Sequence, residues 1–187
     1  MKLWNYIREH LTVYTKQTIS EKSSSLTFEE VAVWAEIFSE KLKKFNCCAI
    51  LCSSQMAAAM SLLACFAADV TALPLSVLYG NTHCNKILDI VSPDAIIMDI
   101  NGEIDVYKLE NSRYVTPAQH AALIMCTSGT TGNPKGIMLS EENIITNVSD
   151  IAEYFSMGLN DTILIARPLY HCARLFRFTA KLFHLLP

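Results

Sequence analysis

The chain has 187 residues, of which 51% are hydrophobic and 18% charged, and this composition excludes a disordered or fibrous protein. Its formal net charge is -3 and it contains no basic block, so we expect no nucleic-acid partner. The most apolar stretch, residues 56–68, contains Ser61 and is shorter than the roughly 20 residues of a membrane span. The charged amino terminus does not fit a signal peptide, and we expect a cytoplasmic protein.

Seven cysteines occur along the chain, most of them inside apolar runs. Their number is odd and no Cys-x-x-Cys pair is present, so the pattern favours neither a disulfide framework nor a zinc site. Cys47, Cys48 and Cys52 are close in sequence, but no second pair of Cys or His follows at ligand spacing. We therefore expect reduced thiols that fill the core, and no metal site.

Apolar residues at helical spacing predict a first helix through Leu3, Ile7, Leu11 and Tyr14. Further along, Thr27 followed by Glu30 is the pattern of a capping box and predicts the start of a second helix. The inner face of this helix is predicted to carry Val31, Trp34, Ala35, Phe38 and Leu42.

Strand and helix signals then alternate. Apolar runs of strand length and helical patterns follow one another at residues 48–52, 55–68, 70–75, 81–91 and 95–98. This alternation predicts an α/β fold with a mostly parallel sheet flanked by helices. Residues 101–117 are polar and irregular, with weak strand character at Val106 and Tyr107, and are expected to cross the surface.

A polar loop lies between an apolar strand at residues 121–126 and a short strand at residues 137–139, with the sequence Thr127-Ser128-Gly129-Thr130-Thr131-Gly132-Asn133-Pro134-Lys135-Gly136. Its glycines allow the backbone to approach a ligand closely, its hydroxyl groups add donors, and Lys135 adds a positive charge. These properties suit a polyphosphate. The last four residues also fit a type I turn that would hold the lysine in place. By composition alone, a flexible surface connection is the alternative.

The order of residues in this loop decides between nucleotide-binding families. It does not match the Walker A pattern GxxxxGK[ST], which argues against a P-loop enzyme. It resembles the signature loop of the adenylate-forming superfamily, which includes acyl-CoA synthetases, adenylation domains of nonribosomal peptide synthetases, and luciferases. Residues 26–30, 48–74 and 136–143 are also similar to segments of that family. The resemblance implies that the fold is the amino-terminal part of the family's large domain, with a β-hairpin phosphate loop.

Members of this superfamily join a small-molecule carboxylate to AMP with release of pyrophosphate, and the acyl group then passes to a thiol. The resemblance implies ATP and Mg²⁺ as cofactors, and either coenzyme A or the phosphopantetheine of a carrier protein as acceptor. It assigns ATP-phosphate binding to Thr127, Ser128, Gly129, Thr130, Thr131, Gly132 and Lys135.

Downstream of the loop, Ser140 is expected to cap a helix, with Glu141 facing solvent in its first turn. The apolar stripe of this helix is predicted to comprise Ile144, Ile145, Val148, Ile151, Ala152 and Phe155. Residues 161–166 predict a further strand. The residues after it resemble a family motif that borders the acyl pocket, which makes Tyr170 and His171 candidates for that pocket. A packed or surface histidine is the alternative for His171.

Residues 1–173 are expected to form the amino-terminal part of an AMP-binding domain, and residues 174–187 a divergent tail with three basic and no acidic residues. The family's catalytic lysine belongs to a carboxy-terminal lid that we expect to be absent, and Lys135 is not that lysine. The resemblance therefore assigns no catalytic residue, and it implies a ligase fragment that is inactive alone. The alternative is a noncatalytic remnant that binds nucleotide phosphate or a partner protein.

Overall fold

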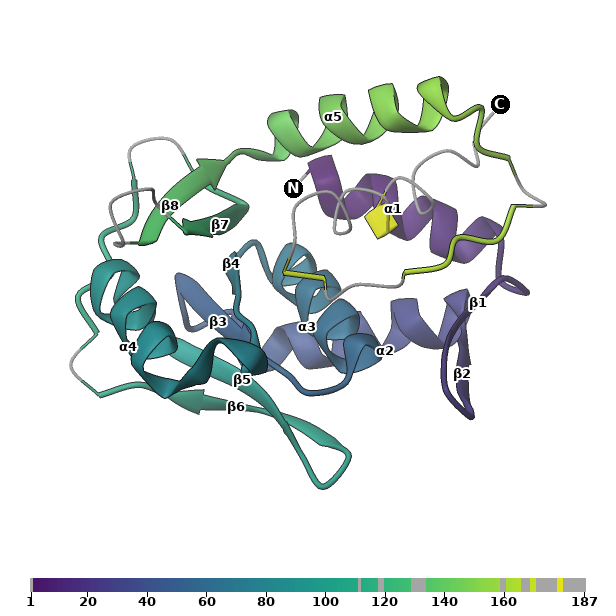
Figure 1. The fold of residues 1–187 in the computed structure, drawn as a ribbon. Helices are drawn as coiled ribbons and strands as arrows, with labels where there is room; N and C mark the ends of the chain where they lie inside the picture. Colours follow the sequence, from purple (N-terminus) through teal and green to yellow (C-terminus); the bar gives the residue numbers. More distant parts are fainter. Residues whose placement is uncertain are drawn as a thin grey trace.

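The fold is built on a six-stranded sheet with helices on both faces (Figure 1). The computed structural model describes residues 2–110, 112–117, 120–128, 134–158, 161–165, 169–170 and 178–179. In chain order, the sheet strands are β3 (Cys47–Leu51), β4 (Thr71–Pro74), β5 (Ala95–Ile100), β6 (Glu103–Lys108), β7 (Leu123–Ser128) and β8 (Pro134–Leu139). They are arranged in the order β6-β5-β3-β4-β7-β8. The four inner strands are parallel, and β6 and β8 pair antiparallel at the two edges, which confirms the predicted α/β class.

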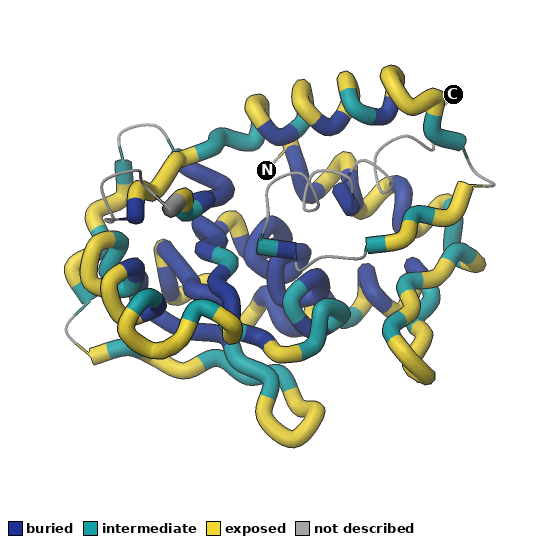
Figure 2. Tube along the Cα trace, in the orientation of Figure 1, coloured by how far each residue is buried: buried dark blue, intermediate teal, exposed yellow. Residues whose placement is uncertain are grey.

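Side chains alternate between two hydrophobic layers, one on each face of the sheet. Figure 2 shows the buried residues concentrated along the central strands and the helices beside them. Cys48 and Ile50 of β3 belong to one layer, whereas Cys47 and Ala49 belong to the other. The first layer also receives the apolar faces of α1 (Lys2–Val13), α2 (Phe28–Leu42), α3 (Gln55–Ala68) and α5 (Glu141–Tyr154). The second layer is covered by α4 (Gly80–Val91), which follows the short 3-10 helix η1 (Val77–Tyr79).

The start of α2 confirms the predicted capping box. Thr27 Oγ1 accepts a hydrogen bond of 3.2 Å from the Glu30 amide, and the Thr27 amide donates one of 2.7 Å to Glu30 Oε2. Thr27 also ends β2 (Ser24–Thr27), which pairs with β1 (Thr18–Glu21) in a separate two-stranded sheet. The capping residue thus joins a hairpin to the helix that packs under the main sheet.

Replacing Thr27 with alanine is expected to lower the free energy of unfolding by about 1 kcal/mol, because the Glu30 amide loses its acceptor at the helix start. The urea midpoint of the variant measures this loss. Ser24→Ala, at an exposed position of the same strand, serves as the control. Equal midpoints for Thr27→Ala and the unmodified chain would show that the capping box contributes no stability.

The segment predicted to be irregular contains a full strand. β6 pairs with β5 along its whole length, from Ile100 opposite Glu103 to Ala95 opposite Lys108. The tight turn between them consists of Asn101 and Gly102, whose φ angles are 53° and 85°. Asn-Gly is the strongest short signal for a hairpin turn. The dipeptide Asn101-Gly102 therefore predicts the β5–β6 hairpin, and an irregular segment was the wrong interpretation of these residues.

Two predictions near the end of the chain are also wrong. Residues 161–165 carry no strand, and no described segment pairs with them to form a ladder. Phe155 lies outside the buried stripe of α5, because the helix ends at Tyr154 and the Phe155 side chain is half exposed. The buried residues of α5 are Ile144, Val148 and Ala152, as predicted.

Glu141 has a structural role that the sequence did not indicate. Its carboxylate accepts hydrogen bonds from the amides of Lys2 at 3.0 Å and Leu3 at 3.3 Å. The residue is thus only partly exposed, and its negative charge lies at the positive end of α1. Glu141 therefore fastens the first helix of the chain to the beginning of α5.

The cysteines that the structure describes are free thiols, and five of the six are buried. No group of three or more His, Cys, Asp or Glu side chains within the described residues could hold a metal ion. In the same part of the chain, no helix has the length and apolar character required to cross a membrane.

Candidate functional site

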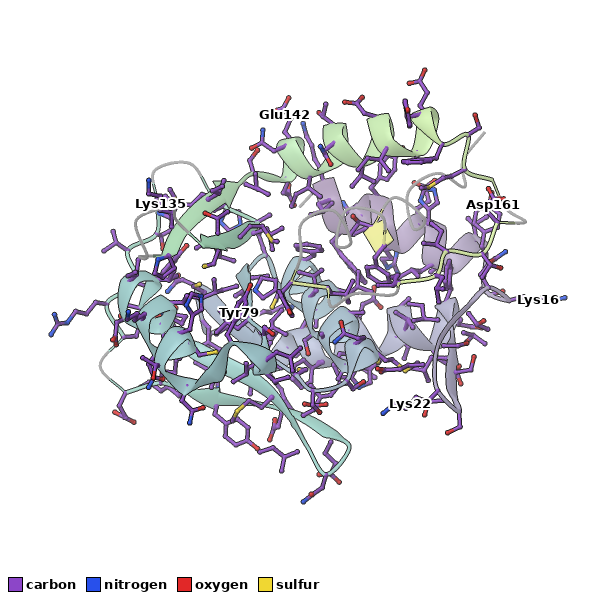
Figure 3. The ribbon with its side chains drawn as sticks, in the orientation of Figure 1. Lys16, Lys22, Tyr79, Lys135, Glu142 and Asp161 are labelled. Atoms are coloured by element: carbon purple, nitrogen blue, oxygen red, sulfur yellow. The ribbon has the colours of Figure 1, made fainter. Side chains whose placement is uncertain are left out.

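The β7–β8 hairpin brings the first and last parts of the predicted phosphate loop together. Thr127 lies directly opposite Lys135 in the antiparallel register, and Ser128 lies opposite Pro134. Residues directly opposite each other in such a pair point to the same face of the sheet. Thr127 and Lys135 are both exposed, and Lys135 makes no ion pair within the described residues. Figure 3 shows the position of Lys135 on β8. A hydroxyl group and an unpaired ammonium group are therefore presented together.

The lysine is held by strand pairing and not by the predicted turn. Pro134, Lys135 and Gly136 all belong to β8 and pair with residues of β7, so they do not form the centre of a type I turn. Gly136 lies tightly against the neighbouring strand, because a Cβ at this position would come within 3.2 Å of Cγ2 of Ile124. The geometry fixes the backbone of Lys135 at the mouth of the loop.

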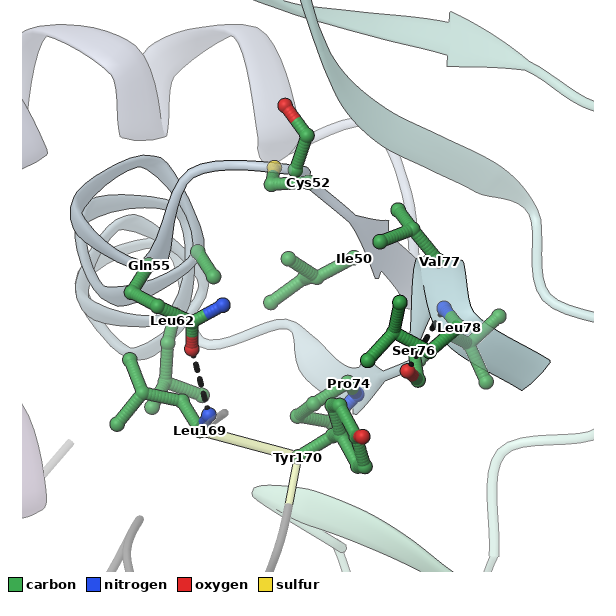
Figure 4. Close-up of a pocket in the computed structure, with 13 residues that line it drawn as sticks. Ile50, Cys52, Gln55, Leu62, Pro74, Ser76, Val77, Leu78, Leu169 and Tyr170 are labelled. Atoms are coloured by element: carbon green, nitrogen blue, oxygen red, sulfur yellow. Dashed lines mark hydrogen bonds between the residues drawn. The ribbon is translucent and has the colours of Figure 1, made fainter. Parts of the chain in front are cut away.

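A small cavity opens beside the carboxyl ends of β3 and β4 (Figure 4). β3 is followed by α3 on one face of the sheet, and the neighbouring β4 is followed by α4 on the other face. Parallel α/β sheets bind their ligands at such a reversal of connection. The volume is about 140 Å³, and the lining is formed by Ile50, Cys52, Ser53, Gln55, Ala58, Leu62, Pro74, Leu75, Ser76, Val77, Leu78, Leu169 and Tyr170.

The hairpin and the cavity open on the same face and at the same edge of the sheet. β7 runs parallel to β4, so their carboxyl ends lie at one edge. Leu123 and Met125 of β7 belong to the same hydrophobic layer as Ile50 and Leu62 of the cavity wall. Because side chains alternate along a strand, Thr127 continues on this face. The backbone pairing thus directs Thr127 and Lys135 toward the side on which the cavity lies.

Tyr79 lies beside the aromatic wall of the cavity. The centre of its ring is 5.1 Å from that of Tyr170 and 4.7 Å from that of His83. Burial, followed by the neighbouring Tyr170, raises the pKa of the Tyr79 hydroxyl, which therefore stays protonated at neutral pH. The pair of tyrosines makes this wall an uncharged aromatic surface.

The amino terminus of α3 is occupied by two carboxylates of the chain itself. Asp99 accepts hydrogen bonds from the amides of Ser53 at 2.6 Å and Ser54 at 2.9 Å. Glu21 accepts from the amides of Gln55 at 3.1 Å and Met56 at 3.0 Å. A helix amino terminus after the first strand is where many α/β folds bind phosphate. Here these amides are already engaged by Asp99 and Glu21, so they are not free to bind a phosphate.

Comparison with known proteins agrees with this geometry. A family model described as AMP-binding enzyme matches residues 8–184 of the chain. The chain belongs to the AMP-binding enzyme family. In this chain the predicted phosphate loop lies between the paired strands β7 and β8 and not before a helix.

Among curated relatives, the sulfoacetate–CoA ligase of Cupriavidus necator is 44% identical over 50 residues, which cover 27% of this chain and 10% of the relative. The solved O-succinylbenzoate coenzyme A synthetase of Bacillus subtilis with AMP superposes with a TM-score of 0.79 at 20% identity, covering 96% of this chain and 53% of that one. The same synthetase with ATP and magnesium ion gives a TM-score of 0.76 at 18% identity and covers 95% and 54%. The chain thus spans about half the length of this solved structure.

The structure describes some of the candidate site residues and not others. Thr127 and Lys135 are adjacent, the backbone of Ser128 continues β7, and Tyr170 lines the cavity. Gly129, Thr130, Thr131, Gly132 and His171 lie outside the described residues, so their assignments stay predictions.

Sequence reasoning missed the cavity residue Gln55, which is 114 positions from its partner Leu169, and no local pattern connects them. It also assigned no role to Tyr79, whose helical neighbours gave no sign of a contact with Tyr170.

No described cysteine near the site has the properties of a nucleophile. Burial raises the pKa of Cys52 and of Cys126 to about 11, so both thiols are protonated at neutral pH. Burial also raises the pKa of Cys84, whose Sγ donates to the Ser76 carbonyl at 3.4 Å. These residues pack the site and do not supply a thiolate, as expected for core-filling cysteines.

Proposed function

We propose that this chain binds the polyphosphate of MgATP through the β7–β8 hairpin as part of a ligase that activates a carboxylic acid. The observation that carries the proposal is the placement of an exposed, unpaired Lys135 opposite Thr127, at the mouth of a loop rich in glycine and threonine. Family membership and the carboxylates at the start of α3 support the same assignment.

In the proposed reaction, an oxygen of the carboxylate attacks the α-phosphorus of ATP, and the bond from this phosphorus to the bridging oxygen breaks to release pyrophosphate. The acyl-adenylate is then attacked by a thiol of coenzyme A or of carrier-protein phosphopantetheine, and AMP departs. Phosphoryl chemistry of this kind depends on positioning and on neutralisation of charge, to which Mg²⁺ contributes. Lys135 and Thr127 would act on the β- and γ-phosphates together with Ser128, Gly129, Thr130, Thr131 and Gly132.

The proposal assigns phosphate binding to this chain and no catalytic residue. Residues 1–173 would correspond to the amino-terminal part of the adenylation domain, with residues 174–187 as a divergent tail. Tyr170, and with it His171, would border the space for the acyl group, because Tyr170 lines the cavity at the same edge of the sheet as the hairpin.

A competition experiment tests this function. We expect the chain to bind MgATP in a calorimetric titration, magnesium pyrophosphate to compete with it, and AMP to bind at least about tenfold more weakly, since the hairpin would hold the terminal phosphates. Binding of AMP as tight as that of ATP, or no binding of MgATP, would overturn the assignment. Pyrophosphate exchange into ATP with added carboxylic acids should stay at background, and exchange above it would show that this chain holds catalytic residues.

A further inference from the structure

The cavity at the ends of β3 and β4 has a lining that limits what can enter it. Eight of its 13 lining residues are aliphatic or proline, and none is Asp, Glu, Lys, Arg or His. A charged group placed here would find no partner of opposite charge on the described walls, and burying an unpaired charge is strongly unfavourable. The cavity therefore favours an uncharged, mainly apolar group.

The volume sets the size of that group. The cavity encloses about 140 Å³. An engineered apolar cavity of about 150 Å³ in another protein binds benzene. A single six-membered ring, or a branched aliphatic group of similar volume, therefore fits this space. A ring would also pack against the Tyr170 side chain, which forms part of the wall and lies beside the Tyr79 ring at a tilt of 57°.

One polar group is held in a fixed orientation at the wall. The Leu169 amide donates a hydrogen bond of 2.8 Å to Gln55 Oε1, which determines which end of the side-chain amide is the nitrogen. Gln55 Nε2 then points toward the enclosed space (Figure 4). It makes no hydrogen bond within the described residues, although an amide nitrogen carries two donors. The cavity thus offers a donor to an oxygen of the bound group.

From this geometry we infer that the cavity binds the acyl part of the carboxylate substrate, that it selects an uncharged, ring-sized acyl group, and that Gln55 Nε2 donates to an oxygen of the carboxylate that becomes the acyl carbonyl. This inference rests on the proposed function, because the hairpin beside the cavity is what identifies the ligand as a carboxylic acid. Simple aromatic monocarboxylates meet these requirements. Dicarboxylates of similar length do not, because their second carboxylate would be unpaired.

The test uses benzoate and succinate as probes of the intact chain, with affinity measured by ligand-observed NMR. We expect benzoate to bind at least about tenfold more tightly than succinate. Gln55→Glu keeps an acceptor for the Leu169 amide and removes the donor, so benzoate affinity should fall by about tenfold or more. Gln17→Glu, which adds the same charge outside this cavity, is the matched control and should leave benzoate affinity unchanged.

A second variant tests the volume of the cavity without a change of charge. Ala58 lines the cavity from α3, and Ala58→Leu should fill it and reduce benzoate binding while circular dichroism stays unchanged. Equal affinities for benzoate and succinate, or undiminished benzoate binding in both variants, would overturn the inference. Binding of MgATP without binding of benzoate would also overturn it while leaving the proposed function intact. Binding of benzoate without MgATP would count against the hairpin alone.

Discussion

Lys135→Ala is expected to weaken the binding of MgATP by about tenfold or more, which corresponds to about 1.4 kcal/mol or more. The exposed lysine makes no ion pair within the described part of the chain, so its charge is available to a phosphate. Its position opposite Thr127 is fixed by backbone pairing, which the substitution leaves in place. Calorimetric titration with MgATP measures the effect, and the urea midpoint should change little.

The matched control is Lys108→Ala. Lys108 is also an exposed lysine of an antiparallel edge strand, but β6 lies at the opposite edge of the sheet from β8. Both substitutions change the net charge equally, so only a local contact predicts a difference. A similar loss in the two variants would indicate long-range attraction alone, and unchanged binding in Lys135→Ala would remove the hairpin from the proposed site.

Acid is expected to destabilise the fold through three carboxylates that are bound by amides and hydroxyl groups. Partial burial raises the pKa of Glu21, Asp94 and Asp99, but hydrogen bonds together outweigh burial and leave each pKa below its ordinary value. The stabilisation is therefore complete above the ordinary values of 4.5 for glutamate and 3.8 for aspartate. It is lost as the pH falls through the lower values of the folded state. Urea midpoints measured between about pH 7 and pH 3 should decline toward the acid end.

Asp99→Asn isolates one of these contributions. Both oxygens of Asp99 accept from backbone amides, Oδ1 from Ser53 and Oδ2 from Ser54. In Asp99→Asn, the side-chain nitrogen of the asparagine would face one of these two donors whichever way the side-chain amide is turned. We expect a loss of about 1–3 kcal/mol at pH 7 and a flatter pH dependence.

Asp94→Asn provides the comparison for this variant. At Asp94 the amides of Asn46 and Cys47 share Oδ2, while Oδ1 accepts only from the Ser112 hydroxyl, which can turn to accept instead. This variant should lose less stability than Asp99→Asn. Equal losses of stability in the two variants would show that the need for two acceptor oxygens at the start of α3 does not determine the contribution of Asp99.

The sequence predicted elements well where a local pattern controls them. The boundaries of α3 match the predicted residues 55–68, and the capping box at Thr27 was found because both of its partners lie within one turn. The order of the strands in the sheet could not be predicted. β4 lies between β3 and β7, and the pairing of β4 with β7 joins segments that are far apart in the sequence. The candidate site also contains one part that local sequence predicts and one part that it does not. The loop was recognised from consecutive residues, whereas the pairing of Gln55 with Leu169 exists only after folding.

The link between Glu141 and the start of α1 has a consequence for synthesis on the ribosome. Glu141, which accepts from the Lys2 and Leu3 amides, is synthesised long after α1. One edge of β4 likewise stays without its partner until β7 has been synthesised. At about 5–20 residues per second, the nascent chain spends several seconds with an open edge of β4 and with the Lys2 and Leu3 amides without their acceptor. The first turn of α1 is therefore expected to become protected later than the rest of that helix, although its residues are synthesised before those of α5.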